Sequence, residues 1–135
     1  MLRTLSDYHR RIGLGLDEIR RFCHDVAADP IVLQRARAAL GRVSIERSRF
    51  INQVVIPRLL VGASYASARD MLALQNQFAA NRLVSDQHVA HWTDETIAAD
   101  WQGYRTAAAA IWRMMEQQMD AERGLVSRHL EHVYL

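Results

Sequence analysis

Three polar residues occupy positions where an apolar helical stripe would place leucine or valine. The stripes run Leu5, His9, Ile12, Leu16, Ile19, Cys23, Val26; then Leu33, Ala36, Leu40, Val43, Arg47, Phe50, Val54; and finally Ala108, Trp112, Met115, Met119, Glu122, Val126, His129, Val133. This spacing predicts that His9, Arg47 and Glu122 point into one interior. A buried charge is costly unless it is paired, so an imidazole, a guanidinium and a carboxylate there suggest an ion pair, a ligand site or a metal site.

The elements that carry these residues read as four long helices. We expect them at about residues 3–27, 30–60, 67–90, and from 97 or 100 to 132. The breaks are Ala28-Asp29-Pro30, the turn Gly62-Ala63-Ser64, and a loop or short turn at 92–96. Pro57 is expected to bend or end the second helix. No alternating strand pattern is sustained. The pattern predicts an all-α protein, an antiparallel up-down four-helix bundle forming one domain over residues 1–135.

Antiparallel topology predicts which polar groups meet at one level of the bundle. His9, near the start of the first helix, would face the end of the second, the start of the third and the end of the fourth. Those regions carry Arg47, the pair Gln77 and Asn81, and Glu122. Inward histidines and carboxylates from several helices are the usual plan of a di-iron bundle site.

Four short segments carry a resemblance to a known family. They are Asp7-Tyr8-His9-Arg10-Arg11-Ile12, Val54-Val55-Ile56-Pro57-Arg58-Leu59-Leu60, Ile97-Ala98-Ala99-Asp100-Trp101-Gln102-Gly103-Tyr104 and Ala121-Glu122-Arg123-Gly124-Leu125. With this layout the chain resembles the hemerythrin-like (HHE cation-binding) family over nearly its whole length. The resemblance implies a four-helix bundle and, for members with an intact site, iron or oxygen handling.

Departures from the family pattern fall on the metal ligands. Counting back from Pro57 places Arg47 and Ile51 where the family has His-x-x-x-Glu. Gln77 and Asn81 take the place of His-x-x-x-His, and Gln118 or Gln117 that of the last histidine. Only His9 and Glu122 remain as ligand types. A guanidinium has no lone pair to donate to a metal. The departures from the family pattern therefore imply a bundle without iron, in which the positive charge of Arg47 takes the place of the metal and pairs with Glu122.

We therefore expect a non-catalytic binding, interaction or regulatory module with no cofactor. The predicted polar cluster is His9, Arg47, Gln77, Asn81, Gln118 and Glu122. No nucleophile accompanies His9 and Glu122, and no glycine-rich phosphate loop is present, so no catalytic residue is assigned. The alternative is an iron- or zinc-binding oxygen or redox sensor whose ligands come from His9, Glu122, His88, His91, His129 and His132.

Apolar and aromatic residues outside the stripes suggest partners. The apolar ones are Leu14, Phe22, Ile45, Ile51, Val55 and Ile56. They suit a homodimer or a protein partner. Trp92, Trp101 and Tyr104 suit either an interface or a second small core under the loop. A pocket around Arg47 would suit a small anionic ligand.

Composition excludes several classes. All 17 basic residues are arginine, and with a net charge of +2 they are scattered, which argues against nucleic-acid binding. Cys23 is the one cysteine and reads as a small buried apolar side chain rather than part of a disulfide or zinc site. No run approaches a membrane span, and the first residues lack the apolar core of a signal peptide. We expect a cytoplasmic, bacterial protein.

Overall fold

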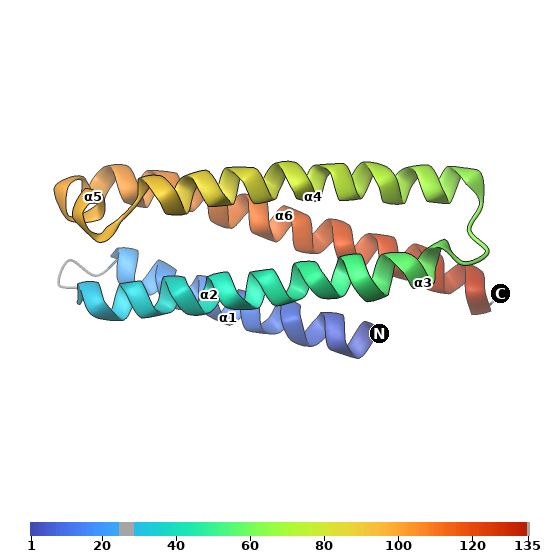
Figure 1. Cartoon of the computed structure of the whole chain (residues 1–135). Coiled ribbons are helices and arrows are strands. Elements are labelled where there is room, and N and C mark those ends of the chain that lie inside the picture. Colours follow the sequence, from blue (N-terminus) through green and yellow to red (C-terminus); the bar gives the residue numbers. More distant parts are fainter. Residues whose placement is uncertain (25–28, 135) are drawn as a thin grey trace. The chain divides into compact units, whose positions relative to one another are not determined.

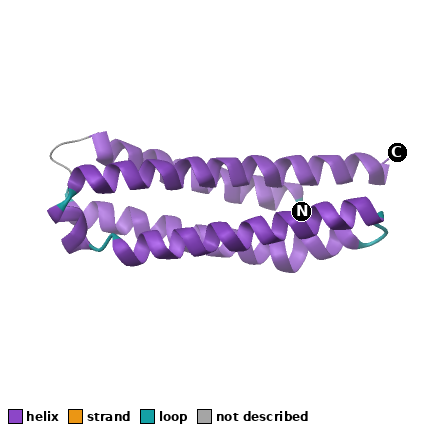
Figure 2. Cartoon of the chain, turned by 90° about the horizontal axis from the view of Figure 1, so that it is seen from above, coloured by secondary structure: helices purple, strands orange, loops and turns teal. Residues whose placement is uncertain are grey.

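The computed structural model describes residues 1–24 and 29–134, with side chains described as far as His129. Almost all of the described residues are helical, and short loops join the helices (Figures 1 and 2). The elements are α1 (Leu2–His24), α2 (Pro30–Phe50), the π-helical turn η1 (Ile51–Val55), α3 (Ile56–Leu60), α4 (Tyr65–His91), α5 (Asp94–Ala99) and α6 (Trp101–Tyr134). Within those residues no strand is found, which confirms the prediction of an all-α protein.

Local capping explains where the helices begin. Asp29 caps α2 by accepting a hydrogen bond from the Ile31 N–H at 3.0 Å, and Pro30 occupies the first helical position, as the sequence predicts. Ser64 caps α4, so this helix begins two residues before the predicted Ser67. Gly62 has a φ of 72°, a left-handed conformation that favours glycine, in the turn before it. The predicted end of the first helix lies partly in residues 25–28, outside the described residues.

The predicted loop at 92–96 is largely helical. Thr93 and Thr96 form a reciprocal capping box, in which each side chain binds the other residue's backbone N–H, and α5 follows directly. A threonine in place of the usual glutamate at the third helical position hides this start signal in the sequence. α6 then begins at Trp101, one residue after the later of the two predicted starts.

The contacts between Cα atoms divide the chain into two compact units, Met1–Val55 and Ile56–Leu135. In the first, α1 and α2 pack antiparallel. The rings of Tyr8 and Phe50 lie 5.7 Å apart between centroids, and Arg11 reaches Glu46 at 3.7 Å further along α1. Still further, a Cβ added at Gly15 would lie 3.2 Å from a Leu40 methyl carbon, so this glycine lets the two helices approach closely.

The predicted stripe of α1 is its buried face. The buried residues of α1 are Leu5, His9, Ile12, Leu16, Ile19 and Cys23. Val26, the last member of the predicted stripe, lies outside the described residues. Cys23 is buried, as predicted.

The second predicted helix does not end at Pro57. Proline has no N–H, and in an α-helix its ring clashes with the carbonyl four residues earlier, here that of Gln53. Gln53 lies inside η1, where the wider π turn relieves the clash, and the chain continues as α3 to Leu60. The extra residue in this turn also shifts the buried face.

This shift corrects one prediction. Ile51, Val55 and Ile56, assigned from the sequence to an exposed interface, are 2%, 0% and 2% exposed. Phe50 and Val54, which the ideal stripe places inside, are only half-buried. Of the three remaining candidates, Leu14 and Ile45 are exposed and Phe22 is half-buried.

In the second unit α4 and α6 pack antiparallel, and α5 packs against α6. The aromatic residues around α5 form a small core. The Tyr104 ring lies 5.8 Å from the rings of both Trp92 and Trp101, and both Tyr104 and Trp92 are buried. Of the two sequence interpretations, the structure supports a core under the loop for these residues.

None of the described helices combines the length and apolar character that crossing a membrane requires.

Candidate functional site: a buried polar chain

The predicted polar residues divide between the two units. His9 and Arg47 belong to the first, and Gln77, Asn81, Gln118 and Glu122 belong to the second. Five of the six are buried: His9, Arg47, Asn81, Gln118 and Glu122. Gln77 is the exception, since it is exposed at the edge of α4.

The four residues of the second unit form one continuous chain of hydrogen bonds. The Gln77 Nε2 donates to Asn81 Oδ1 at 3.1 Å, and the Asn81 Nδ2 donates to Gln118 Oε1 at 2.8 Å. The Gln118 Nε2 then donates to Glu122 Oε2 at 3.3 Å. The sequence analysis predicted a cluster of six residues, and the structure joins these four by hydrogen bonds. We call it the polar chain.

Helical spacing positions each half of the polar chain. Gln77 and Asn81 are four residues apart on α4, and Gln118 and Glu122 are four residues apart on α6, so each pair lies on one helical face. The bond between Asn81 and Gln118 is the only link of the chain that crosses between the helices. It is also the shortest, and both of its residues are buried.

The carboxylate of Glu122 sets the direction of the chain. An ionised carboxylate only accepts hydrogen bonds, so Gln118 must turn its NH2 toward Glu122 and its oxygen toward Asn81. Asn81 must then present its own NH2 to Gln118 and its oxygen to Gln77. Every amide therefore donates toward Glu122, and the orientation of three side chains follows from one charge.

Glu122 is 1% exposed and is one of the most buried side chains of the protein. Met119, Leu125 and Val126 beside it on α6 are also buried. Removing a carboxylate from water costs several kcal/mol, and hydrogen bonds to neutral amides offset only part of that cost. An ionised Glu122 therefore calls for a cation in its surroundings.

His9 and Arg47 lie at one level of the α1–α2 pair. The Tyr8 ring contacts the Phe50 ring, and about one helical turn further along α1 Arg11 contacts Glu46. His9 on α1 and Arg47 on α2 lie between these two contacts. Both side chains are buried, and Arg47 Nη2 donates to Ser48 Oγ at 3.3 Å. The prediction that Arg47 points into the interior is confirmed by its 5% exposure.

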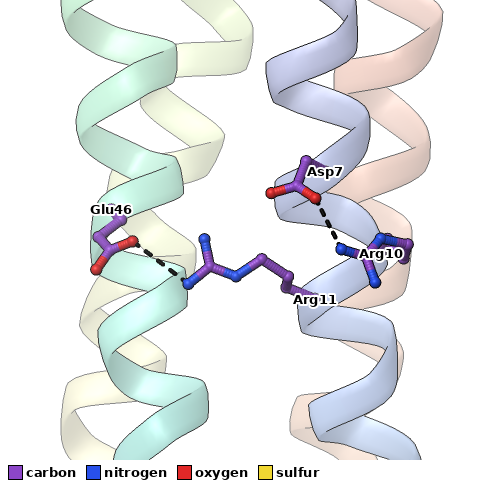
Figure 3. A network of polar contacts seen from close by, with 4 residues as sticks. All are labelled: Asp7, Arg10, Arg11 and Glu46. Atoms are coloured by element: carbon purple, nitrogen blue, oxygen red, sulfur yellow. Dashed lines mark hydrogen bonds and ion pairs between the residues drawn. The ribbon is translucent and has the colours of Figure 1, made fainter.

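Charged residues that the stripe analysis left out surround this level on the surface (Figure 3). Arg10 and Asp7 pair along α1 at 2.8 Å, and Arg11 spans from α1 to Glu46 on α2. Arg11 also lies over the Tyr8 ring, 5.7 Å from its centroid. All four charged side chains are substantially exposed, so each pair contributes little to stability, and only the Arg11–Glu46 pair links α1 to α2. The three-residue spacing of Asp7 and Arg10 on one helical face is a sequence signal for that pair.

The donor set does not fit a di-iron cage. Ile51, at a position where the family carries a carboxylate, has no donor atom and is buried. Arg47 cannot ligate a metal, and the oxygens of Asn81 and Gln118 accept hydrogen bonds within the polar chain. Among the residues that the structure describes, no three or more His, Cys, Asp or Glu side chains gather closely enough to hold a metal ion.

The histidines of the alternative metal hypothesis have other surroundings. The His88 ring stacks on Tyr104, with centroids 6.0 Å apart, and the His91 ring meets the Trp92 ring edge-on at 4.8 Å. His88 is half-buried and His91 is exposed, and both rings contact the aromatic core around α5. His129 is half-buried on α6, and the side chain of His132 lies outside the described residues.

Comparison with known proteins found no match: no family model, no curated protein and no solved structure is similar to this chain at a significant level.

Proposed function

We propose that this protein is a non-catalytic binding module, a hemerythrin-like four-helix bundle in which a buried polar chain takes the place of the di-iron cage. The observation that carries the proposal is the chain from Gln77 through Asn81 and Gln118 to Glu122. It lies at positions where the family pattern places metal ligands, and its amide oxygens already accept hydrogen bonds. A scaffold built in this way retains a helical framework and a surface for binding.

Two features support the bundle architecture within this proposal. Each unit contains an antiparallel pair of long helices, α1 with α2 and α4 with α6. The sequence stripes on α1, α2 and α6 each carry a buried polar residue, respectively His9, Arg47 and Glu122. An up-down bundle would bring the polar faces of the two pairs to a common interior.

In the proposed bundle, Arg47 is the cation that compensates Glu122. The proposal follows from the chemistry of the two groups, since a buried guanidinium and a buried carboxylate each require an opposite charge. A small anion at Arg47 is a further role for the same residue, and it would compete with Glu122 for the guanidinium.

Metal content tests the proposal directly. Protein purified without a histidine tag should contain far less than one iron or zinc per chain by elemental analysis, with no visible absorption band. About two irons per chain with an oxo-bridge band would instead establish the iron-sensor alternative. Glu122→Gln is the matched variant: it should leave the metal content unchanged here, whereas it would reduce iron binding in a working cage.

A further inference from the structure

Helix α4 carries two seams of residues with alternating spacings of three and four. The inner seam is Ser67, Met71, Leu74, Phe78, Asn81, Ser85 and His88, which are all buried or half-buried. The outer seam is Tyr65, Arg69, Leu72, Asn76, Ala79, Leu83, Asp86 and Ala90, which are all exposed. The two seams lie on opposite faces of the helix, because α4 turns by 3.6 residues per turn. Within the second unit, the outer seam is therefore the face of α4 that points away from α6.

The outer seam has the seven-residue spacing of a coiled-coil face, and it carries both large apolar and charged side chains. Its spacing repeats every seven residues from Tyr65 to Ala90, which is almost the whole of α4. Tyr65, Leu72 and Leu83 are 81%, 58% and 60% exposed, which is unusual for large apolar side chains at regular spacing. Alanines at 66, 73 and 80 flank one side of the seam and allow close approach of another helix.

The outer seam is complementary to itself when two copies run antiparallel. With a two-fold axis between Gln77 and Phe78, Leu72 faces the partner's Leu83 and Arg69 faces the partner's Asp86. Asn76 then faces the partner's Ala79, and Tyr65 faces the partner's Ala90. Symmetry repeats each contact, so the pairing contains two leucine layers and two opposite-charge pairs.

Charge selects this orientation over the parallel one. In a parallel pair Arg69 would face the partner's Arg69 and Asp86 the partner's Asp86, so both charged layers would be repulsive. In the antiparallel pair both become attractive. Within one chain Arg69 lies over the Tyr65 ring and Asp86 pairs with Arg82, so both groups already lie ordered along the exposed face.

We infer that the protein binds a second copy of itself through the outer seam of α4, as an antiparallel two-fold dimer. The inference rests on the proposed function in one respect, that the chain acts by binding a protein. Metal content and oligomeric state are separate measurements, so either proposal can fail while the other holds.

Light scattering coupled to size exclusion tests the dimer. The wild type should be dimeric at micromolar concentrations, and Leu72→Glu should raise the dissociation constant about 100-fold, because it places charge in both leucine layers. Leu14→Glu is the matched control, since Leu14 is 57% exposed on α1 and lies outside the seam. Helix content by circular dichroism should be the same in both variants. A monomeric wild type at millimolar concentration, or dissociation by Leu14→Glu instead, would overturn the inference.

Charge exchange tests the pairing of specific residues. Arg69→Glu and Asp86→Arg should each raise the dissociation constant about ten-fold, and the double variant should recover wild-type affinity to within about three-fold. Recovery cannot come from a general effect on folding, because each single change would only add to the other. Additive weakening in the double variant would exclude the Arg69–Asp86 contact.

Spin-label distances determine the orientation. On a Cys23→Ala background, labels at Asn76→Cys would be offset by three residues across the axis, about 4.5 Å along the helix. Labels at Tyr65→Cys would be offset by 25 residues, about 38 Å. A short distance at the first site and a long one at the second are expected. Short distances at both would indicate a parallel pair and refute the antiparallel dimer.

Discussion

Replacing Asn81 by aspartate changes one buried atom and tests the direction of the polar chain. Asn81 Nδ2 donates to Gln118 Oε1 at 2.8 Å, and Asn81→Asp replaces this donor by an acceptor without altering the shape of the side chain. Gln118 cannot correct the mismatch by rotating its amide, because its oxygen would then face Glu122. One contact between two acceptors therefore persists in either orientation.

The expected loss in the free energy of unfolding follows from the polar groups that lose their hydrogen-bond partners. The substitution removes one buried hydrogen bond, worth about 1 kcal/mol, and leaves a buried acceptor unsatisfied, which costs about 1–3 kcal/mol. We expect the free energy of unfolding to fall by about 2–4 kcal/mol near neutral pH. Burial and the nearby Glu122 both favour the protonated form of the new carboxyl, which can donate to Gln118 again. The loss should therefore be largest at high pH and should shrink as the pH falls.

Urea denaturation at about pH 7 and about pH 5, followed by circular dichroism, measures this loss. Asn52→Asp provides the control, since Asn52 is exposed and the same chemical change there meets water. Because both variants make the same chemical change, the difference in their stability isolates the effect of the buried position. Equal stability of Asn81→Asp and Asn52→Asp at neutral pH, or a loss that does not shrink in acid, would refute the directional chain.

Three further substitutions test other parts of the structure in the same assay. If Arg47 compensates Glu122, Arg47→Ala should lower the free energy of unfolding by about 2–5 kcal/mol. The same substitution should cost less in a Glu122→Leu background. Purely additive losses would mean that the two residues do not interact. Gly15→Val should destabilise the protein by about 1–3 kcal/mol, because the new side chain would press on α2. Gly13→Val is the control and should cost little, because the space around a Cβ at that position is open. Equal effects of the two substitutions would contradict the close approach of α1 and α2. Thr93→Ala should cost about 1 kcal/mol by removing the cap of α5, and an unchanged urea midpoint would show that the cap does not contribute.

Local sequence signals predicted the helices more reliably than their ends. Asp29-Pro30 marks the start of α2 because both residue types act within one turn of chain. The Thr93–Thr96 box was missed because its residue types are common in loops as well. The π turn was also missed, since nothing in Ile51-Asn52-Gln53-Val54-Val55 distinguishes a wide turn from an α-helical one.

Burial of the candidate-site residues was also only partly predictable from the sequence. Stripe positions predicted that His9, Arg47 and Glu122 are buried, because a polar residue at a regular apolar position is carried inward with its neighbours. Gln77 occupies an equivalent position in the pattern yet is exposed at the edge of α4. The apolar pattern of α4 is poor, so periodicity alone does not determine how far its face is rotated toward α6.

Sequence by itself determined the helical class, the main breaks and the polar residues at stripe positions, because these depend on periodicity and on interactions within a few residues. Only the tertiary structure decided that Asn81 meets Gln118 across α4 and α6, and that Ile51, Val55 and Ile56 are core residues. The contact between Asn81 and Gln118 depends on packing between two helices, because these residues are 37 positions apart in the sequence. The burial of Ile51, Val55 and Ile56 depends on one π turn before Pro57, which rotates the buried face by an amount that ideal helical spacing does not include.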